Sequence, residues 1–274
     1  MILGREDVAP NTADKDGQAP LMWAVSNGNE GIVKMFLERE DVTPNTADKD
    51  GQTPLSWAAK FEAVDIAKML LEREDITPNI ADKDGQTALL WAVKEEHGGI
   101  VEMLLEREDV TPDIADNSGR TPLLWAAEFL YEDSVKMLLE RKDCGPNTVD
   151  KDGRTPLLCA ARKGYKDIVE MLLEQGDVTP NTSDKDGRTP LSWAVESRRG
   201  DAVKVLLARK DVAPDTVDKD GQTPLQRAVI DRHEDIVRTL LEREDVAPNS
   251  VDKDGRTPLS RASGNGHKDI LSCF

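Results

Sequence analysis

Carboxylates at alternate positions before a glycine are the first residues in this chain whose spacing could do chemistry. The run Asp48-Lys49-Asp50-Gly51 has this form, and it returns at regular intervals along the sequence. Such a run resembles the start of a calcium-binding loop. A complete loop also needs an acidic or amide first ligand and a closing glutamate, but Thr46 and Trp57 hold those two positions. The pattern therefore favours a structural turn, in which aspartates bond their own backbone and glycine supplies a positive φ.

Histidines and cysteines are the other candidates for chemistry, and neither set forms a site by its spacing. The histidines share one slot between two predicted helices, which is more typical of a structural loop residue than of a ligand set: His97, His233 and His267. The cysteines are odd in number and scattered, which indicates neither a disulfide framework nor a metal site: Cys144, Cys159 and Cys273. The sequence shows no phosphate-binding loop, zinc-protease motif or serine-hydrolase motif. We therefore expect no enzymatic activity, no metal and no cofactor.

The charge balance limits the classes of partner. The chain of 274 residues carries a formal net charge of -17. So acidic a surface argues against nucleic acid and against an anionic membrane, since both favour basic faces. It would suit a basic partner, although solubility alone explains the same charge. No apolar run approaches the length of a membrane span, and the N-terminus lacks a signal-peptide core, so we expect a cytoplasmic or nuclear protein.

The chain is organised by a repeat of fixed length. A glycine two positions before a Thr-Pro-Leu-like triplet recurs every 34 residues, at Gly17, Gly51, Gly85, Gly119, Gly153, Gly187, Gly221 and Gly255. A fixed period in this range is typical of a repeat array, in which each repeat contacts only its neighbours.

One repeat is expected to contain a turn, two short antiparallel helices and a long loop. Thr53 and Pro54 have the pattern of an N-cap followed by the first helical residue. Leu55, Ala58 and Ala59 follow at the spacing of a buried helical face, and a second helix is predicted from about Val64. Helices this short are not stable alone in water, so the repeats must stack to bury their apolar faces.

The repeat resembles the ankyrin repeat. The segment Gly51-Gln52-Thr53-Pro54-Leu55, continued by Ser56-Trp57-Ala58-Ala59 and a second helix ending Met69-Leu70-Leu71, matches the family pattern G-x-T-P-L-H-x-A-A and I-V-x-x-L-L. The resemblance implies an all-α solenoid of stacked antiparallel helix pairs with protruding turn fingers. It covers residues 14–274, which we take with the preceding residues as a single domain, 1–274. In that family the fingers and first helices line a concave surface that binds other proteins.

This chain departs from the family pattern at the histidine of TPLH, which is absent from every repeat. A tryptophan follows that position in five repeats, and we expect it to recover the lost burial: Trp23, Trp57, Trp91, Trp125 and Trp193. This style of repeat is similar to that of fungal ankyrin proteins, some of which carry a nucleotide-binding switch domain. The chain begins with a repeat tail at residues 1–13 and stops inside a second helix, so we expect it to be a segment of a longer array.

The repeats disagree mainly at the end of the first helix, where the family resemblance places the binding groove. These positions are Ser26, Asn27, Lys60, Phe61, Lys94, Glu95, Glu128, Phe129, Arg162, Lys163, Ile230 and Asp231. Large apolar side chains there favour recognition, although exposed positions also drift freely. A row of turn arginines, Arg120, Arg154 and Arg188, could meet an acidic stretch of a partner or could simply be solvated.

Two functions from different classes fit these observations. The first is a non-enzymatic scaffold, monomeric, that binds a protein or peptide on its concave face through the first-helix ends and the turns. The alternative is a structural or sensor arm of a larger switch protein, for example a fungal nucleotide-binding ankyrin receptor, from which this chain is a segment.

Overall fold

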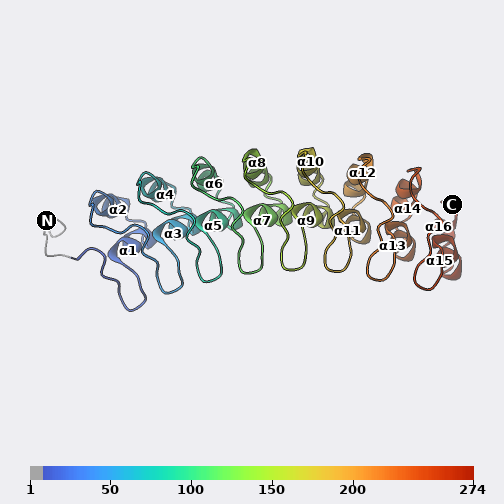
Figure 1. Ribbon diagram of the computed structural model, residues 1–274, viewed down its shortest axis with the longest axis horizontal. Coiled ribbons are helices and arrows are strands. Elements are labelled where there is room, and N and C mark those ends of the chain that lie inside the picture. Colours follow the sequence, from blue (N-terminus) through green and yellow to red (C-terminus); the bar gives the residue numbers. More distant parts are fainter. Residues whose placement is uncertain (1–8) are drawn as a thin grey trace. The chain divides into compact units, whose positions relative to one another are not determined.

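The computed structural model describes residues 9–274, and within them every regular element is an α-helix. The helices come in consecutive pairs (Figure 1). They are α1 (Pro20–Ser26), α2 (Glu30–Leu37), α3 (Pro54–Lys60), α4 (Val64–Leu71), α5 (Ala88–Lys94), α6 (Gly98–Leu105), α7 (Pro122–Phe129), α8 (Glu132–Glu140), α9 (Pro156–Lys163), α10 (Lys166–Glu174), α11 (Pro190–Glu196), α12 (Gly200–Ala208), α13 (Pro224–Ile230), α14 (Glu234–Leu241), α15 (Pro258–Gly264) and α16 (Lys268–Leu271). The all-α prediction is confirmed. The repeat tail expected at residues 1–13 lies mostly outside the described residues.

The predicted start of the first helix is confirmed in atomic detail. The hydroxyl of Thr53 accepts a hydrogen bond from the backbone N–H of Ser56 at 3.2 Å, and the hydroxyl of Ser56 accepts one from the backbone N–H of Thr53 at 2.8 Å. This capping box satisfies donors that a helix start leaves free, and Pro54 at the first helical position has no N–H to satisfy. Thr53 therefore fixes where α3 begins.

The described residues pack into two bodies. The N-terminal body contains residues 9–126 and Lys136–Cys144, and the C-terminal body contains Ala127–Val135 and Gly145–Phe274. In the N-terminal body, the first helices α1, α3 and α5 pack side by side, and the second helices α2, α4 and α6 form another row (Figure 1). The C-terminal body repeats this arrangement with α9, α11, α13 and α15 in one row and α10, α12, α14 and α16 in the other.

The core lies between the two rows of helices. Leu55, Ala58 and Ala59 on α3 are buried, as are Ile66 and Leu70 on α4. The small alanines let the second helix approach the first closely. Because these helices have only seven or eight residues, burial against neighbouring repeats must supply most of their stability.

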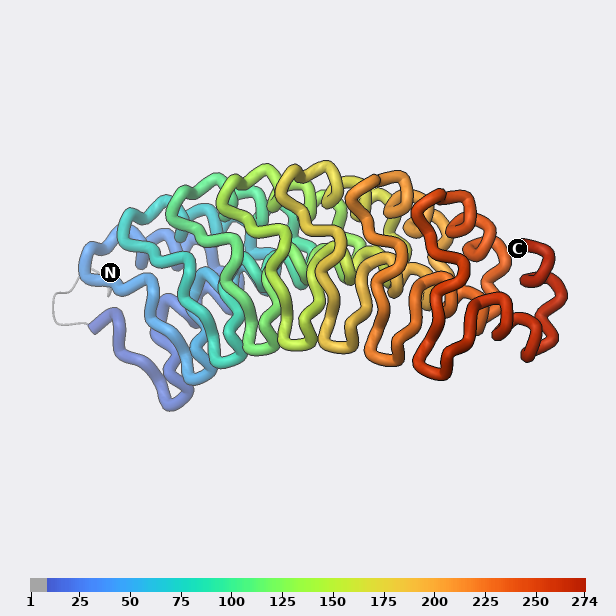
Figure 2. The backbone as a smooth tube through the Cα atoms, turned by 45° about the vertical axis from the view of Figure 1, so that its right-hand side comes forward, coloured from blue at the N-terminus to red at the C-terminus, as the bar shows by residue number. Residues whose placement is uncertain are grey.

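The turns form hairpins that stack on one another within each body (Figure 2). In the third repeat the backbone N–H of Asp82 donates to the carbonyl oxygen of Gln86 at 3.0 Å, and the N–H of Asn117 in the next turn donates to the carbonyl of Asp84 at 2.8 Å. Gly85 has φ 81°, and a Cβ atom there would lie 2.8 Å from the backbone nitrogen of Asn117. Both the left-handed backbone and the close stacking therefore require glycine at this position.

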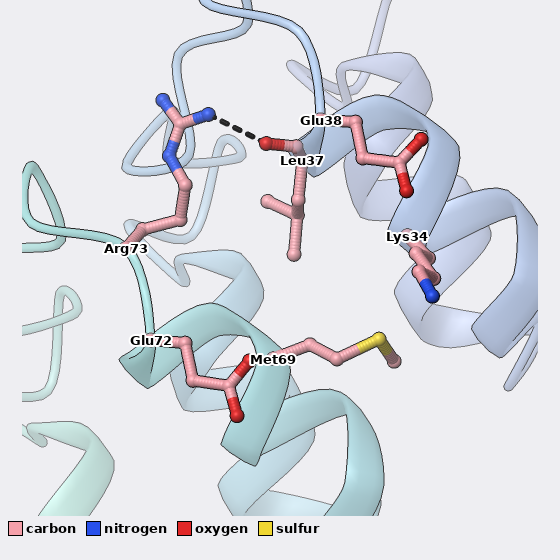
Figure 3. Close-up of a pocket in the computed structure, with 6 residues that line it drawn as sticks. All are labelled: Lys34, Leu37, Glu38, Met69, Glu72 and Arg73. Carbon is pink, nitrogen blue, oxygen red and sulfur yellow. Dashed lines mark hydrogen bonds between the residues drawn. The ribbon is translucent and has the colours of Figure 1, made fainter.

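An arginine after each of several second helices ties successive repeats together. In the N-terminal body, Nη1 of Arg73 donates to the carbonyl oxygen of Leu37, at the end of α2, over 2.8 Å (Figure 3). The same guanidinium pairs with Asp75 at 2.8 and 2.7 Å, and this hydrogen bond lowers the pKa of the Asp75 carboxyl. The arginine thus satisfies a carbonyl that the helix end would leave without a partner. Equivalent bonds to a preceding leucine carbonyl are made by Arg107, Arg141, Arg209 and Arg243.

An asparagine in the long loop makes a second tie between repeats. Nδ2 of Asn181 donates to the carbonyl of Asp211 at 2.7 Å, and its Oδ1 accepts the N–H of Ala213 at 2.8 Å. Asp215 replaces this asparagine in the next repeat. Its Oδ2 still accepts the N–H of Ala247 at 2.9 Å, but its buried Oδ1 has no hydrogen-bond partner among the described residues. Burial, followed by the nearby charge of Asp245, raises the pKa of Asp215.

We predict that Asp215→Asn stabilises the protein at pH 7 by about 1 kcal/mol, because the new amide can donate where the carboxylate cannot. A carboxyl whose pKa is raised by folding lowers stability above its folded pKa, and this cost disappears as the pH falls through that pKa towards 3.8. The gain should therefore shrink near pH 4.

The measurement is urea unfolding of both proteins at pH 7 and near pH 4. The matched control is Asn181→Asp, which should destabilise the protein, and more so at pH 7. A neutral or destabilising effect of Asp215→Asn at pH 7 would contradict the role assigned to the buried oxygen.

Candidate functional site

The turn aspartate links each turn to the first helix of the same repeat. In the third repeat, Oδ1 of Asp82 accepts the backbone N–H groups of Asp84 and Gln86 at 2.9 and 2.8 Å. Its Oδ2 accepts the indole Nε1–H of Trp91 at 3.0 Å. The carboxylate therefore accepts hydrogen bonds from three donors of its own repeat. This arrangement is a structural turn, the interpretation that the sequence favoured over a calcium loop.

The same bond recurs in every repeat that has a tryptophan. The indole donates to the aspartate nine residues earlier at 2.8 to 3.2 Å, in the pairs Trp23–Asp14, Trp57–Asp48, Trp91–Asp82, Trp125–Asp116 and Trp193–Asp184. In the first repeat these bonds lower the pKa of Asp14, with the backbone N–H of Gln18 contributing most and the indole of Trp23 contributing further. The bond holds the indole at the surface beside the turn.

In the three repeats without tryptophan, an arginine donates to the same carboxylate oxygen. Arg227 and Arg261 stand at the tryptophan position and reach Oδ2 of Asp218 and Asp252 at 3.3 and 2.7 Å. In the fifth repeat Cys159 holds that position, and Nε of Arg154 reaches Oδ2 of its turn aspartate at 2.8 Å instead. Every turn aspartate thus has a side-chain donor as well as backbone donors.

The tryptophan prediction needs a correction. We expected these side chains to recover buried surface, but Trp23 is 51% exposed and the other four are only partly buried. The physical reason is that the indole N–H needs an acceptor, and the acceptor in this fold is a carboxylate at the surface. The sequence signal that could have found this role is the arginine that replaces tryptophan nine residues after the aspartate.

The predicted first-helix positions of the N-terminal body lie around these rings. The ammonium group of Lys60 lies 4.1 Å from the ring centre of Trp91 and 5.5 Å from that of Phe61. The ammonium group of Lys94 lies 4.9 Å from Trp91 and 4.8 Å from Trp125. These are cation–π distances, so cations and aromatic rings alternate from one repeat to the next.

The row extends in both directions along this body. Arg120 lies over Trp125 at 4.9 Å, and Phe61 contacts Trp57 with their ring centres 4.9 Å apart. We call the set Trp57, Lys60, Phe61, Trp91, Lys94, Arg120 and Trp125 the aromatic–cationic row. Five residues of this row lie on first helices, namely Trp57, Lys60, Trp91, Lys94 and Trp125. The side chain of Phe61, directly after α3, is 58% exposed.

The predicted arginines of the C-terminal body are largely engaged in internal ion pairs. Arg162 pairs with Glu128 at 2.7 Å and lies over Trp193 at 5.4 Å. Arg188 lies over the same ring at 4.4 Å and pairs with Glu196 at 3.0 Å. Arg154 pairs with its turn aspartate, Asp150. Carboxylates of this chain therefore neutralise two of the three turn arginines that the sequence suggested for an acidic partner, Arg154 and Arg188.

The remaining predicted residues differ in exposure. Glu128 is 7% exposed, and because its carboxylate faces Arg162 inside the protein, we leave it out of the contact surface. Phe129 is 44% exposed and stacks on Tyr131 with ring centres 6.1 Å apart. Exposed or half-buried positions are also held by Ser26, Asn27, Glu95, Lys163, Ile230 and Asp231.

The histidines and cysteines have structural surroundings. Nδ1 of His97 contacts the carbonyl of Ala59 in the preceding repeat at 2.8 Å, and His233 and His267 make the equivalent contact. Burial raises the pKa of the Cys159 thiol to about 12 and raises that of Cys144 as well, so neither carries a thiolate nucleophile at neutral pH. Among residues 9–274, no three acidic, histidine or cysteine side chains lie together as a metal site.

Shallow hollows lie between consecutive second helices. Leu37, Met69, Glu72 and Arg73 line the one between α2 and α4 (Figure 3). The same kinds of residue line hollows between α4 and α6, α6 and α8, and α10 and α12. Their recurrence indicates a product of repeat packing rather than a single ligand site.

Comparison with known proteins agrees with this geometry. The family model for ankyrin repeats (3 copies) matches residues 1–82, 74–150, 135–216 and 208–273. The chain therefore belongs to the ankyrin repeat family, whose members are generally protein–protein interaction modules and typically not enzymes. A search of curated proteins found no match. In the part of the chain that the structure describes, no helix is long and apolar enough to cross a membrane.

We predict that the bond between Trp91 and Asp82 contributes about 1 kcal/mol to folding, the usual size for a partly exposed hydrogen bond. A double-mutant cycle with Trp91→Phe, Asp82→Asn and the double variant, followed by urea unfolding, isolates this coupling from the loss of ring area. Additive effects of the two substitutions would show that the bond does not stabilise the turn.

Proposed function

We propose that this chain is a non-enzymatic scaffold that binds a protein or peptide along the face formed by its first-helix ends and turns. The family resemblance makes this the concave face. The observation that carries the proposal is the aromatic–cationic row, because it keeps large rings partly exposed while hydrogen bonds and neighbouring cations fix their positions. Aromatic and arginine side chains of this kind dominate the energetics of protein interfaces.

The framework supports binding with little ordering cost. Trp57 and Trp91 are held by their turn aspartates, and Phe61 stacks on Trp57, so these rings need not be immobilised by a partner. The turn aspartates already have donors within the chain, as Asp82 has from two backbone N–H groups and Trp91. Exposed apolar side chains surrounded by charge are therefore the surface features left for recognition.

We also propose that the protein acts as a monomer in the cytoplasm or nucleus, without metal or cofactor. The free thiols of Cys144, Cys159 and Cys273 support such a reducing compartment.

We predict that the double variant Phe61→Ala/Phe129→Ala loses most of its partner binding while keeping its thermal stability within a few degrees. Both rings are exposed, so truncation removes contact area for a partner more than it removes core packing. The partner is first captured with the wild-type chain from the source organism's extract and identified, and its affinity for each purified variant is then measured.

The control is Met35→Ala/Val64→Ala, which truncates two exposed apolar side chains on the second helices α2 and α4. This variant should bind as the wild type does. Equal affinity of the phenylalanine variant and the wild type would remove the first-helix face from the proposed function.

A further inference from the structure

The hollows between second helices of the N-terminal body join into one groove. Glu72 lines both the hollow between α2 and α4 and the hollow between α4 and α6, while Glu106 lines the latter and the hollow between α6 and α8. Each hollow therefore shares a lining residue with the next one. We call these three hollows together the second-helix groove. A groove that repeats in this way suits an elongated partner, whereas small molecules usually occupy one enclosed pocket.

Leucine and methionine give the second-helix groove its apolar lining. Figure 3 shows Leu37 and Met69 between α2 and α4, with Glu38 and Glu72 beside them. The apolar residues that line the three hollows are Leu37, Met69, Leu71, Met103, Leu105 and Met137. The methionines among them are only partly buried. Methionine is unbranched and polarisable, so a row of methionines can adapt to apolar side chains of different shapes.

Exposed glutamates border the second-helix groove. Glu38, Glu72 and Glu106 directly follow α2, α4 and α6, and none of the three forms a side-chain ion pair with another described residue. The arginines next to them already have a carboxylate partner, as Arg73 has in Asp75. The C-terminal ends of the helices add the negative ends of their dipoles. The groove therefore has negative charge available for a basic partner.

The charge of the lining differs from hollow to hollow. Lys34 and Lys68 also line the first two hollows, but Glu102 takes their repeat position in the third. Glu106 and Glu140 line that third hollow as well, so the hollow between α6 and α8 is the most acidic of the three. Basic side chains of a partner should therefore bind most strongly at this end of the groove.

The fold does not require glutamate at these positions. In the C-terminal body, Ala208 holds the repeat position of Glu72, and Lys210 holds that of Glu74, an exposed residue two positions further on. That repeat still forms both of its helices, and Arg209 still makes the bond to the preceding leucine carbonyl. Repeat packing therefore does not explain the glutamates of the N-terminal body.

We propose that the second-helix groove binds an amphipathic helix with lysine or arginine beside its apolar stripe. An amphipathic helix that lays its apolar face in a hydrophobic groove is an established mode of recognition. Neighbouring helices pack about 10 Å apart, and seven residues of an α-helix rise about 10.5 Å. An apolar side chain at every seventh position therefore enters successive hollows, and basic side chains next to it reach Glu72 and Glu106. This surface is separate from the first-helix face proposed above.

A divalent cation is the rival ligand for exposed carboxylates, because calcium takes about six to eight oxygen ligands. The geometry disfavours it. Within residues 9–274, no three acidic, histidine or cysteine side chains lie close enough together to hold a metal ion. The glutamates of successive repeats are separated by the helix spacing of about 10 Å, which is too far for one ion but fits cations carried along a peptide.

The test uses fluorescein-labelled peptides and fluorescence polarisation with the full chain at about 0.15 M salt, where screening acts beyond about 8 Å. The first peptide is a helix with leucine at every seventh position and lysines on either side of the leucines. A second peptide replaces each lysine by glutamine, and a third carries two central prolines that break the helix. The first should bind about tenfold more tightly than the other two, which corresponds to about 1.4 kcal/mol.

The double variant Glu72→Gln/Glu106→Gln should weaken binding of the first peptide about tenfold, because each of these glutamates lines two hollows and would lose its charge. Both side chains are exposed, so the variant should fold as the wild type does. The matched control is Glu174→Gln/Glu242→Gln, which makes the same change at the same repeat position in the C-terminal body and should leave binding unchanged.

Several outcomes would overturn the inference. They are absence of binding, equal binding of the glutamine or proline peptide, an unchanged affinity in Glu72→Gln/Glu106→Gln, and an equal loss in the control variant. Phe61→Ala/Phe129→Ala should bind the first peptide as the wild type does. A loss of binding in that variant would place the peptide on the first-helix face and would also overturn the inference.

Discussion

The rest of this structure depends on a carboxylate that must satisfy several donors at once. Each turn aspartate accepts backbone N–H groups two and four residues later, and it also accepts a side-chain donor, as Asp82 does from Trp91. The first set of bonds closes the turn. The last bond attaches the turn to the first helix, and stacked backbone bonds then attach it to the next turn. Because short helices cannot hold their places alone, these local bonds and the buried stripe between repeats act together.

The choice of side-chain donor decides what each repeat shows at its surface. Where tryptophan is the donor, a large ring stays partly exposed. Three of these rings, Trp91, Trp125 and Trp193, also attract a lysine or arginine from their own or the neighbouring repeat. Where arginine is the donor, as in Arg227 and Arg261, the same turn closes without offering a ring. The framework requirement is therefore uniform along the chain, while the chemistry of the surface differs between repeats. This separation lets the exposed surface vary without loss of the fold.

Most of the fold could be predicted from the sequence because its signals are local and repeated. The N-cap at Thr53 and the helix start at Pro54 follow from residue type and position, and the structure confirms both. The candidate surface was harder to predict. Tryptophan beside alanine and leucine suggests a core residue, and only its bond to an aspartate nine positions earlier explains its exposure. Likewise, the burial of Glu128 depends on Arg162 one repeat away, a contact that no local pattern reveals. The hydrogen bond from Arg73 to the carbonyl oxygen of Leu37 also connects two repeats.

The most direct test of this account is hydrogen exchange of the tryptophan indole N–H groups, followed by NMR on the ¹⁵N-labelled protein. If each turn carboxylate holds its indole, the Nε1–H of Trp57, Trp91 and Trp193 should exchange much more slowly than that of a free indole, even though the rings are partly exposed. Exchange at the rate of a solvent-exposed indole in the folded protein would contradict the account, because the rings would then lack the bond that places them on the surface.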